Sequence, residues 1–444
     1  MSTNPVEAQP TEKTRTMTLR GAVFLGIGSM VGAGIFALFG QAGSIAGAAV
    51  WVSFLISGII ALLQGYSFAK LGARFPSSGG VIDWMVRGYG TGMFTAGIVM
   101  LGYFSYLITV AMVAVSFGNY AASLFLGDNA SQVWVKGFAA AVVIALTFLN
   151  MVGAQNTVKA QTVLTTIVLV ILTGFALAML TQINPSLLAP ANYPPLSAVL
   201  ASVALTFFSY LGFGVLAFTG GDIQEPQKNM PRAMYISLGF TMILYIALAI
   251  GVFGTLTVEQ VIANAETALA AAALPIFGAV GFTLISIAAV FACAGAINAT
   301  LYASLGASYL MAKNGMLPPS FGLKHRGGTE GSRGLMISAA AIVLMAVLFD
   351  LGAIASVGSA VVLAISVLVT IAHLRMTQDT KASKPILWIA LLASLLAVLI
   401  FAAYTLLTDP MTFVALLITI ILAWVVEWVW VRISKRQPIA EAGK

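Results

Sequence analysis

The amino-acid sequence predicts an all-α polytopic membrane protein, and three observations support this prediction. The 444 residues are 60% hydrophobic and 8% charged, whereas a soluble domain averages about 25% charged residues. Runs of about 20 apolar residues recur along the whole chain, and each is long enough to span a bilayer as a helix. The positive charges fall between these runs in a regular order. Because the apolar runs occupy most of the chain, no length remains for a sizeable soluble domain.

Twelve transmembrane helices are expected, at 19–42, 46–70, 91–126, 134–152, 157–181, 197–220, 233–256, 276–312, 335–350, 352–374, 384–407 and 411–432. An even number places both termini on one side of the membrane. If that side is the cytoplasm, all of the 21 basic residues except Lys136 lie inside, as the positive-inside rule requires. We therefore expect a multi-pass cell-membrane protein with cytoplasmic termini. The net charge of +7 reports this topology and does not indicate binding to nucleic acid.

The two ends of the chain are polar. The N-terminal tail, 1–17, is predicted to be disordered, and it lacks the apolar segment of a cleavable signal peptide. The C-terminal tail, 433–444, is predicted to be cytoplasmic as well. The single cysteine, Cys293, excludes an internal disulfide and is expected to be a packing residue.

Two of the predicted spans carry glycines in their middle. The first contains GIGSMVGAGIF at 26–36, and the sixth contains TFFSYLGFGVLAFTGG at 206–221. Each glycine costs a helix interior about 0.5–1 kcal/mol relative to alanine. Interrupted spans at corresponding positions of two halves indicate an inverted-repeat transporter. The expected repeats are 18–182, with spans one to five, and 196–375, with spans six to ten; spans eleven and twelve, at 384–432, lie outside them.

An unwound helix frees backbone groups that need partners in a bilayer. Freed N–H groups near Gly32–Gly34 form a positive dipole end that suits a carboxylate. Freed carbonyls near Ser29–Met30 and Phe208–Leu211 suit an ammonium group. A site with both ends would bind an α-amino acid. The alternative explanation for these glycines is close helix packing, since Gly28 and Gly32 fit a small-xxx-small pattern.

Four motifs resemble the amino acid–polyamine–organocation (APC) superfamily of transporters. They are GSMVGAGIF at 28–36, FPSSGG at 75–80, FFSYLGF at 207–213 running into DIQEPQKNMPRAM at 222–234, and MAKNGMLPPSF at 311–321. The resemblance implies an amino acid permease with a LeuT-like 5+5 inverted repeat, in which helices 1 and 6 are unwound. In the cytoplasmic motif, we expect Asp222 and Glu225 to pair with Lys228 or Arg232.

The resemblance also implies roles for single residues. Ala33 and Gly34 would offer N–H groups to the substrate carboxylate, while the carbonyls of Met30, Phe208 and Leu211 would receive the amine. The ring of Phe208 would close over the substrate as an outer gate. The complete predicted substrate-binding set is Ser29, Met30, Gly32, Ala33, Gly34, Phe208, Leu211 and Gly212.

Two positions depart from the family pattern. Many relatives carry an acid in the sixth helix where this chain has Gly214. Many proton-coupled relatives carry a lysine in the fifth helix, where this chain has Val168. We therefore expect no lysine, histidine or carboxylate in the core of the two repeats to act as a proton carrier.

The lack of charge in the broken spans bears on the substrate. A cationic side chain would need a buried carboxylate partner, and an anionic one a buried arginine or lysine. Neither occurs near 28–34 or 206–214, which favours a neutral amino acid. A polyamine or cationic amino acid is the alternative, if cation–π contacts suffice. The expected pocket walls are Tyr103, Ser105, Tyr106, Asn298, Tyr302, Ser356 and Ser359.

The coupling mode is open at this stage. Sodium could bind between carbonyls of the first span and polar side chains of the eighth, with Asn298, Thr300 and Ser304 as candidates. A proton is the other coupling ion considered, and exchange of one amino acid for another needs no ion. Helix–helix hydrogen bonding is the plainer explanation for all three side chains.

Other functional classes fit less well. An enzyme would need a catalytic dyad or metal cluster, which one cysteine and two loop histidines do not supply, so neither catalysis nor a cofactor is expected. A channel would need a continuous polar pore, and a sensor usually adds a soluble output domain. We therefore expect a secondary transporter, a permease or exchanger, that moves an amino acid by alternating access.

Overall fold

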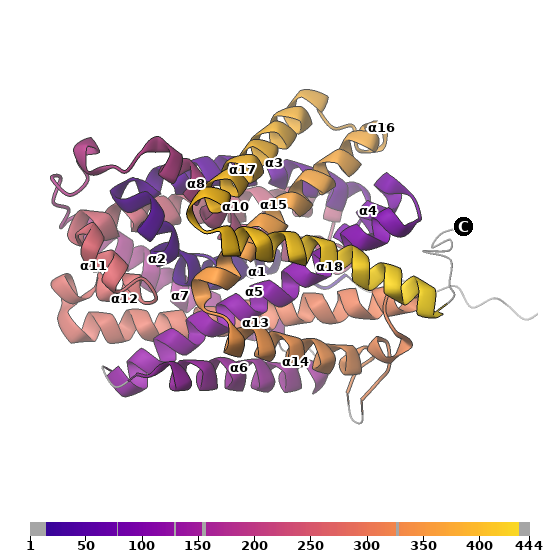
Figure 1. The fold of residues 1–444 in the computed structure, drawn as a ribbon, viewed down its shortest axis with the longest axis horizontal. Coiled ribbons are helices and arrows are strands. Elements are labelled where there is room, and N and C mark those ends of the chain that lie inside the picture. The colour runs from indigo at the N-terminus through magenta and orange to yellow at the C-terminus, as the bar shows by residue number, and fades with distance from the viewer. Residues whose placement is uncertain (1–14, 78, 128–129, 153–156, 326–327, 435–444) are drawn as a thin grey trace, which may run out of the picture.

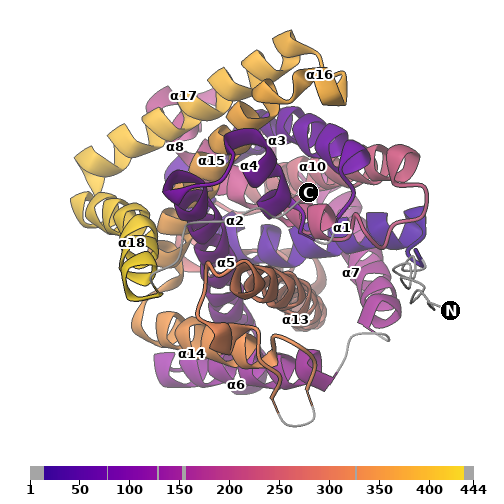
Figure 2. The same ribbon diagram turned by 90° about the vertical axis from the view of Figure 1, so that its right-hand side faces the viewer.

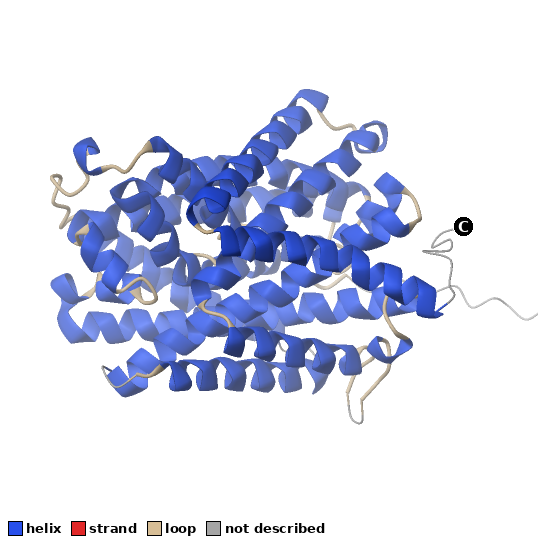
Figure 3. Cartoon of the chain, in the orientation of Figure 1, coloured by secondary structure: helices blue, strands red, loops and turns tan. Residues whose placement is uncertain are grey.

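The computed structural model describes residues 15–77, 79–127, 130–152, 157–325 and 328–434, and within them every regular element is a helix (Figure 3). The elements are α1 (Leu19–Ala33), α2 (Ile35–Ala46), η1 (Gly47–Ala49), α3 (Val50–Arg74), α4 (Val81–Tyr89), α5 (Met93–Leu126), α6 (Gln132–Val152), α7 (Thr157–Leu180), η3 (Pro190–Asn192), α8 (Leu196–Phe208), η4 (Leu211–Gly214), α9 (Val215–Phe218), α10 (Pro226–Thr255), α11 (Val258–Ala263), α12 (Ala268–Ala271), α13 (Leu274–Lys313), η5 (Pro319–Phe321), α14 (Ser332–Leu348), α15 (Leu351–Arg375), α16 (Thr377–Thr380), α17 (Lys384–Thr408) and α18 (Pro410–Ser434). The predicted all-α fold is confirmed.

Each of the twelve predicted spans coincides with a helix or a broken helix of the described chain. Within the described residues, ten stretches are long and apolar enough to cross a membrane, by length and composition, and one of them joins α2 to α3. The shorter apolar helices α1 and α14 complete the set. The first span is thus α1 with α2, and the sixth is α8 with η4 and α9.

The boundary between the ninth and tenth spans lies at Asp350. Its backbone is extended, and its side chain accepts a hydrogen bond from the Ala353 N–H over 2.8 Å, which caps the start of α15. Predicted ends at 350 and 352 therefore become Leu348 and Leu351. The eighth span is broken near its start: α13 runs from Leu274 to Lys313, but the backbone at Gly278 (φ 61°, ψ −155°) is not helical, so the long continuous helix begins after Gly278, slightly later than the predicted start at 276.

The first and sixth spans run in opposite directions. Met17, just before α1, donates its N–H to the Asp222 carbonyl, and its own carbonyl accepts from the Gln224 N–H, both over 2.9 Å. The start of α1 and the end of α9 therefore lie at the same end of the molecule, here called the terminal face. Figure 2 views the molecule from that side, with α4 toward the viewer. The predicted tails lie largely outside the described residues, at 1–14 and 435–444.

The helices form two groups, which occupy the upper and lower halves of Figure 1. In one group α3 packs against α10 and α8, and α1 packs against α10. In the other, α5, α6, α13 and α14 contact one another. α1 also packs against α13, so the first helix break lies between the groups. Outside them, α17 covers α8 and α15, and α18 covers α5 and α15. The end opposite the terminal face, which carries α11 and α12, is called the distal face.

Candidate functional site

The first helix break lies at Gly34, between α1 and α2, where the backbone (φ −95°, ψ −80°) departs from helical geometry. The Gly34 N–H donates to the Met30 carbonyl over 2.7 Å and closes the last turn of α1. A Cβ at this position would collide with the Ser209 carbonyl and the Tyr245 hydroxyl. Glycine is therefore required here by the close approach of neighbouring groups.

The second break separates α8 from η4 at Ser209 and Tyr210. Gly212, in η4, lies against the peptide between Ser29 and Met30 so closely that an added Cβ would overlap its atoms. The two broken segments are thus in direct contact through backbone.

Tyr245 of α10 lies at this junction. It is fully buried, and its hydroxyl donates to the Met30 carbonyl over 2.7 Å and lies 3.3 Å from the Ser209 carbonyl. Carbonyls at the end of a helix lack some of their helical partners, although the Met30 carbonyl still accepts from the Gly34 N–H. One hydroxyl from a third helix therefore supplies a donor to both breaks.

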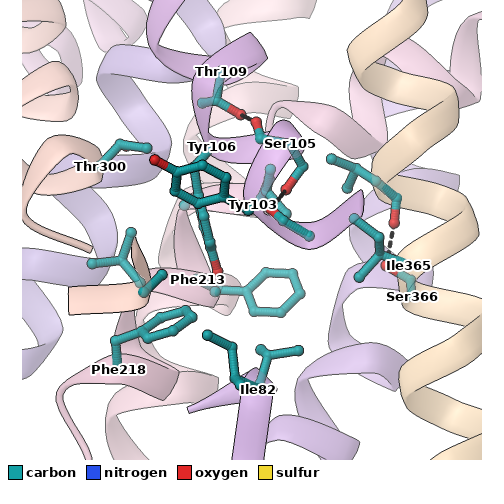
Figure 4. A pocket seen from close by; sticks show the side chains of 18 of the residues that line it. Ile82, Tyr103, Ser105, Tyr106, Thr109, Phe213, Phe218, Thr300, Ile365 and Ser366 are labelled. Atoms are coloured by element: carbon teal, nitrogen blue, oxygen red, sulfur yellow. Dashed lines mark hydrogen bonds between the residues drawn. The ribbon is translucent and has the colours of Figure 1, made fainter. Parts of the chain in front are cut away.

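A central cavity of about 60 Å³ lies beside the two breaks. At about 10–15 Å³ for each water, it has room for about four to six waters. Figure 4 shows Tyr106, Phe213 and Phe218 around it, with Ile82 at one end. The lining residues are Ser29, Ala33, Phe68, Val81, Ile82, Met85, Ile98, Val99, Gly102, Tyr103, Ser105, Tyr106, Thr109, Leu211, Gly212, Phe213, Gly214, Val215, Phe218, Thr300, Ala307, Val362, Ile365 and Ser366. Because α4 and α9 contribute to the wall, the cavity extends toward the terminal face.

None of the described residues that line this cavity is charged. Several hydroxyls in the wall already donate to carbonyls one turn earlier in their own helices: Thr109 to Ser105 over 2.7 Å, Thr300 to Ala296 over 2.9 Å, and Ser366 to Val362 over 2.9 Å. Their oxygens therefore offer lone pairs to the cavity and no proton. Such a wall accepts hydrogen bonds from a donor such as an ammonium group.

Ser29 differs from these hydroxyls. Its side chain is 1% exposed, lines the cavity, and its Oγ has no hydrogen-bond partner among the described residues. An unpaired buried hydroxyl costs about 1–3 kcal/mol. A ligand in the cavity would remove that cost, so Ser29 marks a position where a polar group fits.

Phe208, at the end of α8, lies on the distal side of the second break. Its ring lies so close to α15 that a Cβ at Gly358 would be 2.6 Å from Cε1, and Ile108 of α5 adjoins the same spot. The phenylalanine is 1% exposed and does not line the cavity. It therefore packs α8 against α5 and α15 on the distal side of the two breaks.

Comparison with known proteins assigns the chain to a family. A model for amino acid permeases matches residues 17–434, nearly the whole sequence. The chain belongs to the amino acid permease family. It is therefore a transporter of the APC superfamily, which confirms the family membership that its motifs predicted.

Named relatives cover much of this permease. The inner membrane transport protein YbaT of Escherichia coli is 33% identical over 86% of this chain and 89% of its own length. The serine/threonine exchanger SteT of Bacillus subtilis is 28% identical over 68% of this chain and 69% of its own. The vacuolar cationic amino acid transporter 4 of Arabidopsis thaliana is 30% identical over 70% of this chain and 55% of its own.

The predicted substrate-binding residues of the permease fall into three places. Ser29, Ala33, Leu211 and Gly212 line the central cavity. Met30 and Gly34 lie just behind it, where the Met30 carbonyl is already engaged by two donors. Two members lie elsewhere. Phe208 packs distally, and Gly32 lies against the Ala292 carbonyl of α13, where an added Cβ would collide with it.

The candidate ion-site residues do not converge. The Asn298 Oδ1 accepts from the Asn150 Nδ2 of α6 over 2.7 Å. Thr300 lines the central cavity, and Ser304 donates to the Leu301 carbonyl of its own helix over 2.9 Å. Of the three candidates, only Thr300 lines the central cavity.

Among the predicted pocket walls, Tyr103, Ser105 and Tyr106 line the cavity, while Asn298, Tyr302, Ser356 and Ser359 do not. Sequence reasoning missed the α4 residues Val81, Ile82 and Met85, because their helix follows the second span and reaches the cavity only through the tertiary fold. It also missed Tyr245. An isolated tyrosine in a long apolar span carries no pattern by which its hydroxyl could be placed.

Proposed function

We propose that this permease moves a neutral α-amino acid across the plasma membrane by alternating access. The observation that carries the proposal is the uncharged central cavity at the contact of two broken helices, with the unpaired Ser29 hydroxyl in its wall. The neutral substrate follows from the cost of burying an unpaired charge in such a cavity.

Backbone groups of the two breaks would hold the substrate's carboxylate and amine. The Gly34 N–H and the Met30 carbonyl bond to each other over 2.7 Å in this conformation. A bound amino acid would exchange this internal bond for bonds to its own charged ends, while wall hydroxyls such as Thr300 and Ser366 accept from its ammonium group. We propose that the cavity widens when this exchange occurs.

The transport cycle would rock the group of α1, α3, α8 and α10 against the group of α5, α6, α13 and α14. Phe208 would serve as the gate on the distal side, which the positive-inside rule assigns to the exterior. The contact of its ring with α15 supports a conformation closed to that side. Both termini would then be cytoplasmic.

Counterflow in proteoliposomes tests this function. Vesicles are loaded with one unlabelled amino acid, and uptake of the same labelled compound is followed with and without a sodium gradient. We expect counterflow with neutral amino acids, and none with arginine, lysine or putrescine. Counterflow restricted to the cationic compounds would contradict the proposal and favour the alternative suggested by the name of the Arabidopsis relative. Stimulation by sodium would identify the coupling ion, whereas indifference to it would favour exchange.

A further inference from the structure

A second cavity, of about 450 Å³, opens at the distal face. It lies between α2, α5, the start of α6 and the segment that joins α11 to α12. Its lining residues are Gln41, Asn119, Ser123, Gly127, Ala130, Gln132, Val135, Ile262, Ala263, Asn264, Ala265, Glu266 and Thr267. No residue lines both this distal cavity and the central one. The two are therefore separate cavities.

The distal cavity is polar and negatively charged. Glu266 is the one ionisable side chain among its described lining residues, and it is half-buried. Burial and the nearby Asp350 carboxylate raise the pKa of Glu266 above its ordinary value. Asp350 caps the start of α15 next to the wall. None of the described residues that line the distal cavity is lysine, arginine or histidine. A bound cation would therefore not be repelled by a side chain of the cavity wall.

Asn119 gives an independent indication of a ligand. It is 4% exposed, lines this cavity, and neither its Oδ1 nor its Nδ2 has a hydrogen-bond partner within the described chain. Buried amides are almost always hydrogen-bonded, and leaving both ends unpaired is costly. The amide therefore leaves an unused donor and an unused acceptor in the wall of the cavity.

We propose that the distal cavity is a second binding site for a small organic molecule that carries an ammonium group. The Glu266 carboxylate is its counter-ion, and the Asn119 amide bonds to its polar atoms. A bare metal ion fits less well. The volume far exceeds an ion's needs, and the described residues hold no group of three acidic, histidine or cysteine side chains that could ligate one.

Thiol labelling of the purified full-length protein tests the proposal without requiring transport. Ser123→Cys places a reporter in the wall of the distal cavity, and the native Cys293 is fully buried, so the parent protein supplies the blank. The probe ligand is ethylammonium. It lacks a carboxylate and so does not resemble the substrate proposed for the central cavity. Acetate and ethanol are the comparison solutes.

Ethylammonium is expected to slow the labelling of the reporter by an uncharged reagent, while acetate and ethanol leave the rate unchanged. A cationic thiol reagent is expected to react about tenfold faster than an anionic one, relative to the same pair at an exposed Ser186→Cys reporter. Glu266→Gln is expected to abolish both effects. Glu259→Gln removes an acid of α11 that does not line the cavity, and it is expected to preserve them.

The proposal is wrong if ethylammonium gives no protection, if acetate protects equally, or if protection survives Glu266→Gln. Protection by calcium or sodium chloride alone, equal to that by ethylammonium, would indicate an inorganic cation site instead. Asp350→Asn retains a capping oxygen and provides a second variant, expected to reduce the preference for the cationic reagent by a smaller factor. Because counterflow is measured separately, failure of this site and failure of the proposed transport are distinguishable.

Discussion

At the scale of single residues, the hydroxyl of Tyr245 is the group that ties the two helix breaks to the surrounding bundle. Tyr245→Phe leaves the Met30 carbonyl with the Gly34 N–H alone. We expect the protein to fold and the apparent affinity in counterflow to fall by a factor of about 2 to 13, since one buried hydrogen bond is worth about 0.5–1.5 kcal/mol. Tyr210→Phe is the matched control. It removes a buried hydroxyl that donates to the Phe54 carbonyl over 3.0 Å, away from the Met30 carbonyl. Equal losses in both variants would contradict a specific role for Tyr245.

Gly34 is the residue where the smallest change should have the largest effect. In Gly34→Ala, the added Cβ meets the Ser209 carbonyl and the Tyr245 hydroxyl, neither of which is the end of a flexible chain. The breaks must separate, so we expect counterflow to be lost while the protein still inserts in the membrane. Gly174→Ala, on an exposed face of α7 with open space around it, is the control and should retain activity. Normal counterflow by Gly34→Ala would refute the site geometry.

An ion pair between residues close in sequence was predictable, because opposite charge and short spacing are enough to bring the two side chains together. The expected pairing of Glu225 with Lys228 is confirmed at 2.9 Å, because the two lie three residues apart in an exposed loop and first turn. The lysine holds the pKa of Glu225 below its ordinary value. The role of a glycine, in contrast, could not be read from the sequence. Gly32 packs two helices together and Gly34 breaks one, and the two functions call for the same residue.

At the scale of elements, the proposed gate depends on the packing of α8 on α15 through Phe208 and Gly358. Gly358→Ala would place a methyl group 2.6 Å from Cε1 of Phe208 and 2.9 Å from Ile108. Overpacking costs about 1–3 kcal/mol, so we expect the closed conformation to lose population by a factor of about 5 to 150. The measurement is the rate at which an impermeant thiol reagent, added outside intact cells, reaches Ala33→Cys in the central cavity.

That rate should rise in Gly358→Ala and return toward the parent value when Phe208→Leu is added, because the smaller side chain makes room for the methyl group. An unchanged rate in the single variant would show that this contact does not control access. A raised rate that the second substitution fails to reverse would place the strain at Ile108 instead.

A second element-scale contact joins three helices through one amide. Gln64 of α3 is fully buried; its Nε2 donates to Ser394 of α17 over 2.8 Å, and its Oε1 accepts from Thr370 of α15 over 2.9 Å. Hydrogen bonds between membrane helices are worth about 0.6 kcal/mol each, and at most about 1.7. Gln64→Met should therefore lower the melting temperature of the purified protein by about 2–4 °C per kcal/mol lost. Ser44→Ala, at a partly exposed bond within α2, should lower it less.

Elements were predictable from the sequence because a bilayer demands long apolar helices with internally satisfied backbones. Their ends were less predictable. The end of α14 and the start of α15 depend on whether Asp350 caps a helix, and the start of α13 depends on a positive φ at Gly278. The wall that α4 contributes to the central cavity arises from tertiary packing between distant segments, and hydropathy carries no record of it.

At the scale of the whole molecule, charge defines an orientation that is testable on intact cells. The terminal face gathers segments distant in sequence: the Arg375 guanidinium at the end of α15 donates to the Gly88 carbonyl of α4 over 3.3 Å. Trp430 near the end of α18 donates to the Gly315 carbonyl just after α13 over 3.0 Å. Among the described residues, the basic side chains other than Lys136 belong to sequence segments that the predicted topology places at this face, whereas Lys136 lies near the start of α6, at the distal cavity's end of the molecule.

The positive-inside rule therefore predicts a cytoplasmic terminal face and an external distal face. An impermeant thiol reagent added outside intact cells should label Gln132→Cys, which is exposed at the distal face, and should leave Lys384→Cys at the start of α17 unlabelled until the membrane is permeabilised. The buried Cys293 contributes no background in either variant. The opposite pattern would invert the orientation and make Phe208 an inner gate. The distal cavity with Glu266 would then face the cytoplasm, and the ammonium-bearing ligand proposed for it would have to come from there.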